Sequence, residues 1–318
     1  MADIKPAIFG HAEFTAYNES ATRLFAKWKV ANTPRLRGIA QGGKPKALIE
    51  TLSEDLLDTF ERARLLDPYD VYQHLLDYWA MTMQDDIYMI VSDGWREAAQ
   101  PRLIIEDKDK KTKERPDFTV GKLKCKAELI PTALVIARYF VAEQAAIERL
   151  EAEVADIEQA MEEMAEEHGG EEGLLEEAKN DKDKLTKASV AARLKEIKGD
   201  ADAANERKVL NAYLAISEKE AATSARANAA QEALLAKVAA QYGKLTEDEI
   251  KTLVVDDKWL AMLAAAVQGE LDRVSQTLTG RVRQLAERYA TPLPQLTGEV
   301  AGLETKVTRH LERMGFKA

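Results

Sequence analysis

The chain has 318 residues, and 46% of them are hydrophobic, which is enough apolar surface for real cores and excludes global disorder. A formal net charge of -10 argues against a protein that coats nucleic acid by bulk charge. The longest stretch without a charged residue, 259–269, is about half of the roughly 20 residues that a membrane-spanning helix needs. A single cysteine, Cys125, cannot form an internal disulfide and favours the reducing cytoplasm. The opening residues also lack the apolar run of a secretory signal.

Residues 1–130 predict a mixed α+β domain, because the residue pattern changes about every 20 residues. Helical periodicity is expected over 14–30, 46–65 and 69–83, and the last of these helices begins with Asp67 as N-cap and Pro68 at its first position. Runs rich in β-branched or aromatic residues predict short strands over 87–91, 103–105 and 118–129. The expected arrangement is a small antiparallel sheet against helices.

Residues 131–242 predict a long antiparallel coiled-coil hairpin. Apolar residues recur at alternating steps of three and four up to His168. A second pattern of similar length spans 205–242. Two matched helices most simply fold back on each other, so the hairpin tip is expected over 169–204. The expected seam of the first helix consists of Phe140, Ile147, Leu150, Val154, Ile157, Met161 and Met164.

Residues 243–318 predict a C-terminal helical segment. A capping box from Thr246 to Glu249 begins it, and a long helical pattern follows over 260–289. A last helix begins near residue 291, and its apolar residues follow a heptad that a lone helix cannot bury. Two roles of this apolar row are equally compatible with the sequence, namely packing back on this chain and binding another protein. The expected partner-binding residues are Leu293, Leu296, Val300, Leu303, Val307 and Leu311. The fold class is therefore mainly α, with the small sheet in the N-terminal third.

One stretch, 23–46, carries seven basic residues and no acid, although the whole chain is acidic. We interpret it as a flexible basic loop beside Trp28 that contacts DNA phosphates, because neutralised phosphates release counterions. A solvated loop, or contact with an acidic protein face, is an equal alternative. Three lysines on a predicted strand could extend the same surface. The candidate nucleic-acid-binding residues are Arg23, Lys27, Lys29, Arg35, Arg37, Lys44, Lys46, Lys122, Lys124 and Lys126.

Four long segments resemble the distal half of the methyltransferase (M) subunits of type I restriction-modification systems. They are KPAIFGHAEFTAYNE at 5–19, LLDPYDVYQHLLDYWAMTMQDDIYMI at 65–90, LTEDEIKTLVVDDKWL at 245–260 and VQGELDRVSQTLTGRVRQLAERYATPLPQL at 267–296. Ordered matches of this length are more specific than a short motif, and they bracket nearly the whole chain.

The resemblance implies a parent subunit that binds S-adenosylmethionine and methylates adenine at N6 in DNA, with a specificity subunit and a restriction subunit as partners. The catalytic motifs of that family are absent here, because the chain has neither an F-x-G-x-G loop nor two adjacent prolines. No catalytic or cofactor-binding residue therefore carries over, and an upstream methyltransferase domain is expected to precede this segment. The chain is expected to be a non-catalytic assembly and DNA-clasping module that binds DNA weakly.

Two alternatives stay open. The first is a stand-alone DNA-binding or decoy protein. The second is a metal-dependent nuclease, because Asp93 followed by Glu106-Asp107-Lys108 has the order of carboxylates and lysine that such enzymes use. The four histidines are scattered and do not predict a zinc site, and Asp67-Pro68-Tyr69 is better explained as a helix cap than as a methyltransferase motif.

Overall fold

The computed structural model describes residues 6, 10–105, 114–170, 173–180, 182–290 and 293–316. The chain is mainly helical with one small antiparallel sheet in its N-terminal third, which confirms the predicted fold class. It forms two compact units, and we call them unit 1 (Met1–Gly94 with Val254–Ala318) and unit 2 (Trp95–Leu253). The sequence suggested three consecutive blocks, whereas unit 1 joins segments from both ends of the chain.

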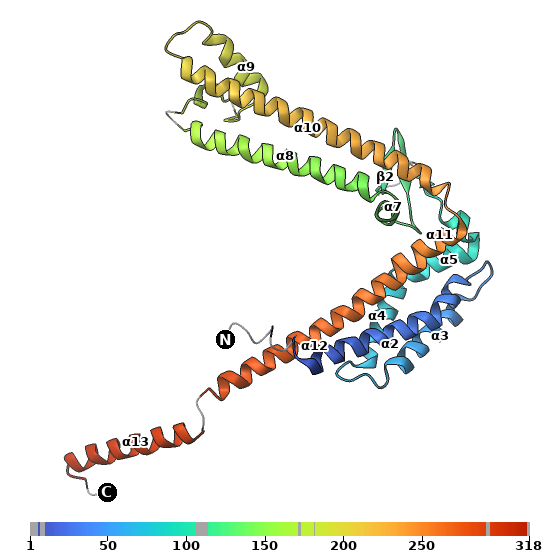
Figure 1. Cartoon of the computed structure of the whole chain (residues 1–318), viewed down its shortest axis with the longest axis vertical. Coiled ribbons are helices and arrows are strands. Elements are labelled where there is room, and N and C mark those ends of the chain that lie inside the picture. Colours follow the sequence, from blue (N-terminus) through green and yellow to red (C-terminus); the bar gives the residue numbers. More distant parts are fainter. Residues whose placement is uncertain are drawn as a thin grey trace. The chain divides into compact units, whose positions relative to one another are not determined.

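Unit 1 is built from helices that pack on one another (Figure 1) and bury apolar side chains between them. Its elements are α2 (Ala12–Arg37), α3 (Pro45–Phe60), α4 (Pro68–Tyr78), η1 (Trp79–Met83), α5 (Gln84–Asp93) and α12 (Ala261–Arg288). Helix α3 packs on α2, α4 and α5, and α12 packs on α4 and α2. Trp28 is buried, and its indole Nε1 donates to the carbonyl oxygen of Leu52 at 3.1 Å, which joins α2 to α3.

The predicted strand over 87–91 is wrong, since these residues lie inside α5. A short apolar run does not by itself distinguish a strand from a buried helix. The buried side chains Met83, Ile87 and Ile90 follow helical spacing, and the π-helix η1 carries the chain from α4 into α5 without a break. The helix ends at Gly94, whose φ of 83° suits glycine. In contrast, the cap at Asp67 is confirmed, because its side chain accepts from the backbone N–H of Tyr69 at 2.9 Å.

The expected flexible basic loop is also corrected by the structure. Helix α2 runs through Pro34 to Arg37, so the break before α3 covers only residues 38–44. The buried series Phe25, Trp28 and Leu36 keeps a helical period across Pro34. Proline has no N–H, so Pro34 cannot donate to the carbonyl group four residues before it in the helix. Pro34 is exposed, so this missing hydrogen bond lies on the solvent side of the helix.

The sheet of unit 2 has the strand order β1-β3-β2, and all neighbouring strands are antiparallel. The strands are β1 (Arg102–Leu103), β2 (Phe118–Val120) and β3 (Leu123–Lys126), with α6 (Trp95–Ala98) just before them. Gly121, with a φ of 60°, makes the turn between β2 and β3, and Phe118 lies opposite Cys125 in the register. Phe118 also stacks on Tyr242, which joins the sheet to the hairpin.

The hairpin consists of α8 (Val141–His168) and α10 (Ala204–Tyr242), which lie side by side in Figure 1. Ion pairs show its direction: Glu143 at the start of α8 meets Lys237 near the end of α10, and Glu153 meets Lys219. The antiparallel pairing was predicted, and so was the end of the first helix at His168. The first pattern is not one helix, however, because a break at Phe140 separates α7 (Thr132–Tyr139) from α8.

The tip of the hairpin has its own small core. The chain here forms η2 (Glu176–Ala178) and α9 (Lys187–Glu196), and the C-terminal end of α8 and the N-terminal end of α10 complete the packing. Buried members of this cluster are Leu175, Ala178, Val190, Ile197, Leu210 and Tyr213. The connection back to unit 1 passes through α11 (Glu247–Lys251), begun by the predicted capping box of Thr246 and Glu249, and the π-helix η3 (Thr252–Leu260). None of the helices in the described ranges combines the length and the apolar composition that a bilayer crossing requires.

Candidate partner-binding and nucleic-acid surfaces

The last helix, α13 (Leu293–Arg313), buries none of its residues. We call its apolar row, namely Leu293, Leu296, Val300, Leu303, Val307 and Leu311, the terminal stripe. These six side chains are between 40% and 76% exposed, although their spacing places them on one side of the helix. The two accounts of this helix were packing on this chain and binding another protein, and the structure shows no packing of α13 on the described chain.

The distal part of α12 continues this feature. Every described residue from 280 to 316 is exposed. Apolar side chains recur at steps of four and three at Leu278, Val282 and Leu285 of α12 and at its C-cap residue Tyr289, and each is at least a third exposed. Both helices thus present apolar rows that the described chain leaves uncovered. Such amphipathic rows are typical of surfaces that pair with another helix.

The candidate DNA-binding residues of α2 do not form one basic surface. Arg35 pairs with Asp55 of α3 and donates to Asn32 Oδ1 at 2.7 Å. Arg37 pairs with Asp256 of η3 at 2.5 Å. Arg37 therefore links two distant segments of unit 1, whereas the more exposed Arg35 pair contributes little stability; the charges of both arginines are already balanced by carboxylates.

The remaining basic residues of the stretch are dispersed. Arg23 and Lys27 are exposed and lie one turn apart on one side of α2, whereas helical geometry directs Lys29 to another side. Lys44 is the N-cap residue of α3, and Lys46 is exposed in its first turn. Of these residues, the structure thus brings only Arg23 and Lys27 together.

The three candidate lysines of unit 2 do not alternate along one strand. Lys122 lies in the turn after Gly121, and only Lys124 and Lys126 lie on β3. Lys126 approaches Glu114 at 3.6 Å, and the same carboxylate pairs with Arg102. Hydrogen bonds from Arg102 lower the pKa of the Glu114 carboxyl group, so the edge of this sheet is a mixed ion-pair network.

The described residues do not test the nuclease hypothesis. Asp93 ends α5, while Glu106, Asp107 and Lys108 lie outside the described residues. Over the parts of the chain that are described, no three histidine, cysteine or acidic side chains are grouped to hold a metal ion.

A buried ion pair, which the sequence did not indicate, lies between α5 and η3. Lys258 Nζ donates to Asp86 Oδ2 at 2.6 Å, and the indole Nε1 of Trp259 donates to the same oxygen at 2.8 Å. Burial raises the pKa of the Asp86 carboxyl group, and the contacts with Lys258 and Trp259 counteract that rise. Asp86 is therefore a buried residue that links two segments far apart in the chain.

A second polar cluster joins α4 and α12. The buried carboxylate of Glu270 accepts from Arg273 Nε at 2.7 Å, and Arg273 also pairs with Asp70 at 2.8 Å. His74 lies 3.6 Å from the other oxygen of Glu270. The hydrogen bonds from Arg273 lower the pKa of Glu270, with a smaller lowering from His74. This cluster is best explained as a link between the helices α4 and α12.

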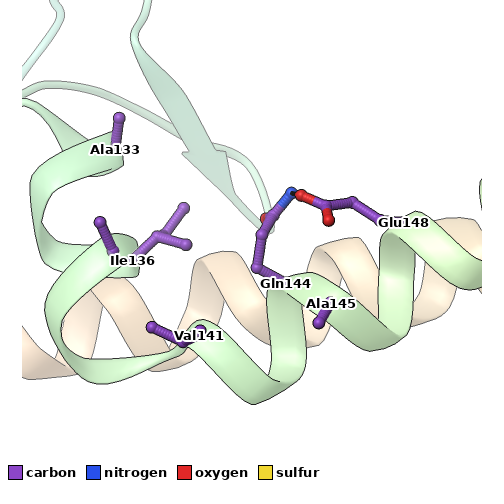
Figure 2. A pocket seen from close by; sticks show the side chains of 7 residues that line it. Ala133, Ile136, Val141, Gln144, Ala145 and Glu148 are labelled. Atoms are coloured by element: carbon purple, nitrogen blue, oxygen red, sulfur yellow. Dashed lines mark hydrogen bonds between the residues drawn. The ribbon is translucent and has the colours of Figure 1, made fainter.

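Unit 2 has a shallow apolar groove of about 560 Å³ where α7 meets α8 (Figure 2). Ile136, Val141 and Ala145 line it, and at its rim Gln144 donates to Glu148 at 3.0 Å. The polar groups at this rim bind each other, so the groove offers apolar contact and little else for recognition.

The chain was also compared with known proteins. No protein-family model, no curated protein and no solved structure matches it.

Proposed function

We propose that this chain is the non-catalytic assembly and DNA-clasping module of a type I restriction-modification methyltransferase subunit, and that its terminal stripe binds helices of the specificity subunit. The four segments that resemble such subunits support the family. The observation that carries the docking role is that no residue of α13 is buried and that its apolar row is roughly half exposed. The motifs that would hold S-adenosylmethionine are missing from the sequence, so no step of methyl transfer to adenine N6 is assigned to this chain.

The exposed area sets how much binding energy α13 can supply. Full burial of one large aliphatic side chain contributes about 1.5–3 kcal/mol. Because the side chains of the terminal stripe are roughly half exposed, each would contribute about 1 kcal/mol and the six together about 6 kcal/mol. Association costs about 4–15 kcal/mol, so α13 alone would bind weakly. The apolar row of distal α12 would roughly double the area, and we therefore expect both helices to be needed.

The test is co-purification with a specificity subunit. We define the stripe triple as Leu296→Ser, Leu303→Ser and Val307→Ser in one chain. Its matched control places three serines on the opposite side of α13, at Thr305, Arg309 and Glu312, which leaves the net charge unchanged. The stripe triple should abolish co-purification, and the control should retain it.

Two results would contradict the docking role. One is retention of the specificity subunit by the stripe triple. The other is a melting temperature of the isolated stripe triple many degrees below that of the unchanged chain, since this would place α13 in the chain's own core.

A further inference from the structure

Unit 1 contains a groove of about 900 Å³ between α2 and the loop that follows α3. Three arginines line it: Arg23 from α2, and Arg62 and Arg64 from the loop. We call it the arginine groove. Tyr17 forms part of its wall, and Glu13 is a carboxylate in the lining. Three guanidinium groups outnumber the lining carboxylate of Glu13 and that of Glu19, which contacts Arg23, so the groove is locally cationic in a chain whose net charge is -10.

The arginines of the groove are not used to hold the fold together. Arg62 and Arg64 are exposed, and neither forms an ion pair within the described residues. Arg23 contacts Glu19 at 3.4 Å, but both side chains are more than half exposed, and such surface pairs contribute little. Arg35 and Arg37 differ, because each is bound to a carboxylate of another element. The groove therefore gathers three arginines that no other element of unit 1 uses as ion-pair partners.

The two walls of the groove are the turn at Leu65 and helix α2. Leu65 has a φ of 61°, a left-handed conformation that costs energy in a residue with a branched side chain and persists only where the surroundings impose it. This turn presents Arg62 and Arg64 beside α2. On the α2 wall, the hydroxyl group of Tyr17 is buried and has no hydrogen-bond partner among the described residues, a state that costs free energy until a partner is supplied.

We propose that the arginine groove binds phosphate groups of the backbone of duplex DNA. Guanidinium groups match phosphate oxygens in pairs, and contacts to phosphate need no base sequence. The choice of DNA as the source of phosphate rests on the proposed function. The description of the groove as a phosphate-binding site rests only on its lining residues. Of the ten predicted basic residues the proposal uses Arg23, and it adds Arg62 and Arg64, which the sequence did not single out.

The test measures binding of the full chain to a fluorescent duplex by anisotropy at several salt concentrations. The groove triple is Arg23→Gln, Arg62→Gln and Arg64→Gln. Its charge-matched control is Lys182→Gln, Lys195→Gln and Lys198→Gln, three exposed lysines at the hairpin tip of unit 2. Three phosphate contacts give a salt slope of about -2.7, and at 0.05 M salt each contact is worth on the order of tenfold in affinity. The groove triple should lose most of this slope and at least about tenfold in affinity, while the control keeps both.

Two further variants separate a built site from general charge. Arg23→Lys, Arg62→Lys and Arg64→Lys together keep the net charge but lose the paired guanidinium geometry, so affinity should fall several-fold. Tyr17→Phe should weaken binding without lowering the melting temperature. A groove triple that binds DNA as the control does would overturn the proposal, and so would a lysine variant that binds as the unchanged chain does.

The source of the phosphate and the fate of the proposed function are tested separately. Inorganic pyrophosphate and ATP are added as competitors, and DNA should remain the tighter ligand. Saturation by ATP at concentrations that leave duplex DNA unbound would overturn the assignment to DNA. The groove triple should still co-purify with the specificity subunit, so loss of DNA binding in that variant and loss of docking in the stripe triple are independent results.

Discussion

The buried pair of Asp86 and Lys258 allows a quantitative prediction about unit 1. Lys258→Met removes the ammonium group and keeps much of the apolar volume of the side chain. The carboxylate of Asp86, whose side chain is only 5% exposed, then keeps the indole of Trp259 but has lost its opposite charge. Removing one partner of a buried ion pair costs about 3–5 kcal/mol, because the other charge stays buried. For a unit of this size that corresponds to a decrease in melting temperature of about 6–20 °C.

A second substitution tests the cause of this loss. Asp86→Asn combined with Lys258→Met leaves no charge in the core, and the amide oxygen of Asn can still accept from Trp259. We expect the double variant to recover most of the stability that Lys258→Met loses, which a double-mutant cycle measures. Thermal unfolding followed by circular dichroism supplies all four values. The reasoning is refuted if Lys258→Met changes the melting temperature by less than about 2 °C, or if the double variant is no more stable than the single one.

The effect of pH on Lys258→Met follows from the raised pKa of Asp86. A carboxyl group whose pKa is higher in the folded than in the unfolded chain takes up its proton more readily in the folded state, so folding is favoured as the pH falls. The stability lost in Lys258→Met should therefore be largest at alkaline pH and should diminish as the pH falls through the folded pKa of Asp86. A loss that does not diminish as the pH falls would contradict this cause.

The other predictions concern single features of each unit. The stripe triple should lower the melting temperature of the isolated chain by no more than about 6 °C, because each of its three exposed substitutions changes stability by about 0.5 kcal/mol or less; a larger decrease in calorimetry would show that α13 is packed. Glu270→Gln should weaken the acid sensitivity of unit 1, because a lowered carboxyl pKa contributes stability that is lost as the pH falls through that pKa; equal pH profiles in urea titrations would argue against it. Tyr242→Phe removes the hydroxyl that donates to the carbonyl oxygen of Ile130 at 2.6 Å, and urea unfolding should show a loss of about 1–3 kcal/mol, whereas a loss below about 0.5 kcal/mol would mean that the bond contributes little.

Local signals in the sequence predicted most of the helical framework. The cap at Asp67, the capping box at Thr246 and the end of α8 at His168 are each set by residues within one turn, so they follow from the sequence alone. The antiparallel hairpin was predicted because two long apolar patterns of similar length leave few other ways to be buried. The binding partner of α13 stays a prediction.

The tertiary structure decided those features that depend on residues far apart in the chain. Ile87 is in a helix because the core of unit 1 buries one side of α5, although the run 87–91 has the composition of a strand. Arg37 is a structural residue because Asp256, more than two hundred residues later, lies beside it. In the same way, only the fold shows that Arg23 and Arg64 line one groove and that Asp86 pairs with Lys258. Periodicity reports what a segment buries, but the partner that buries it or balances its charge is chosen by the packing of distant segments.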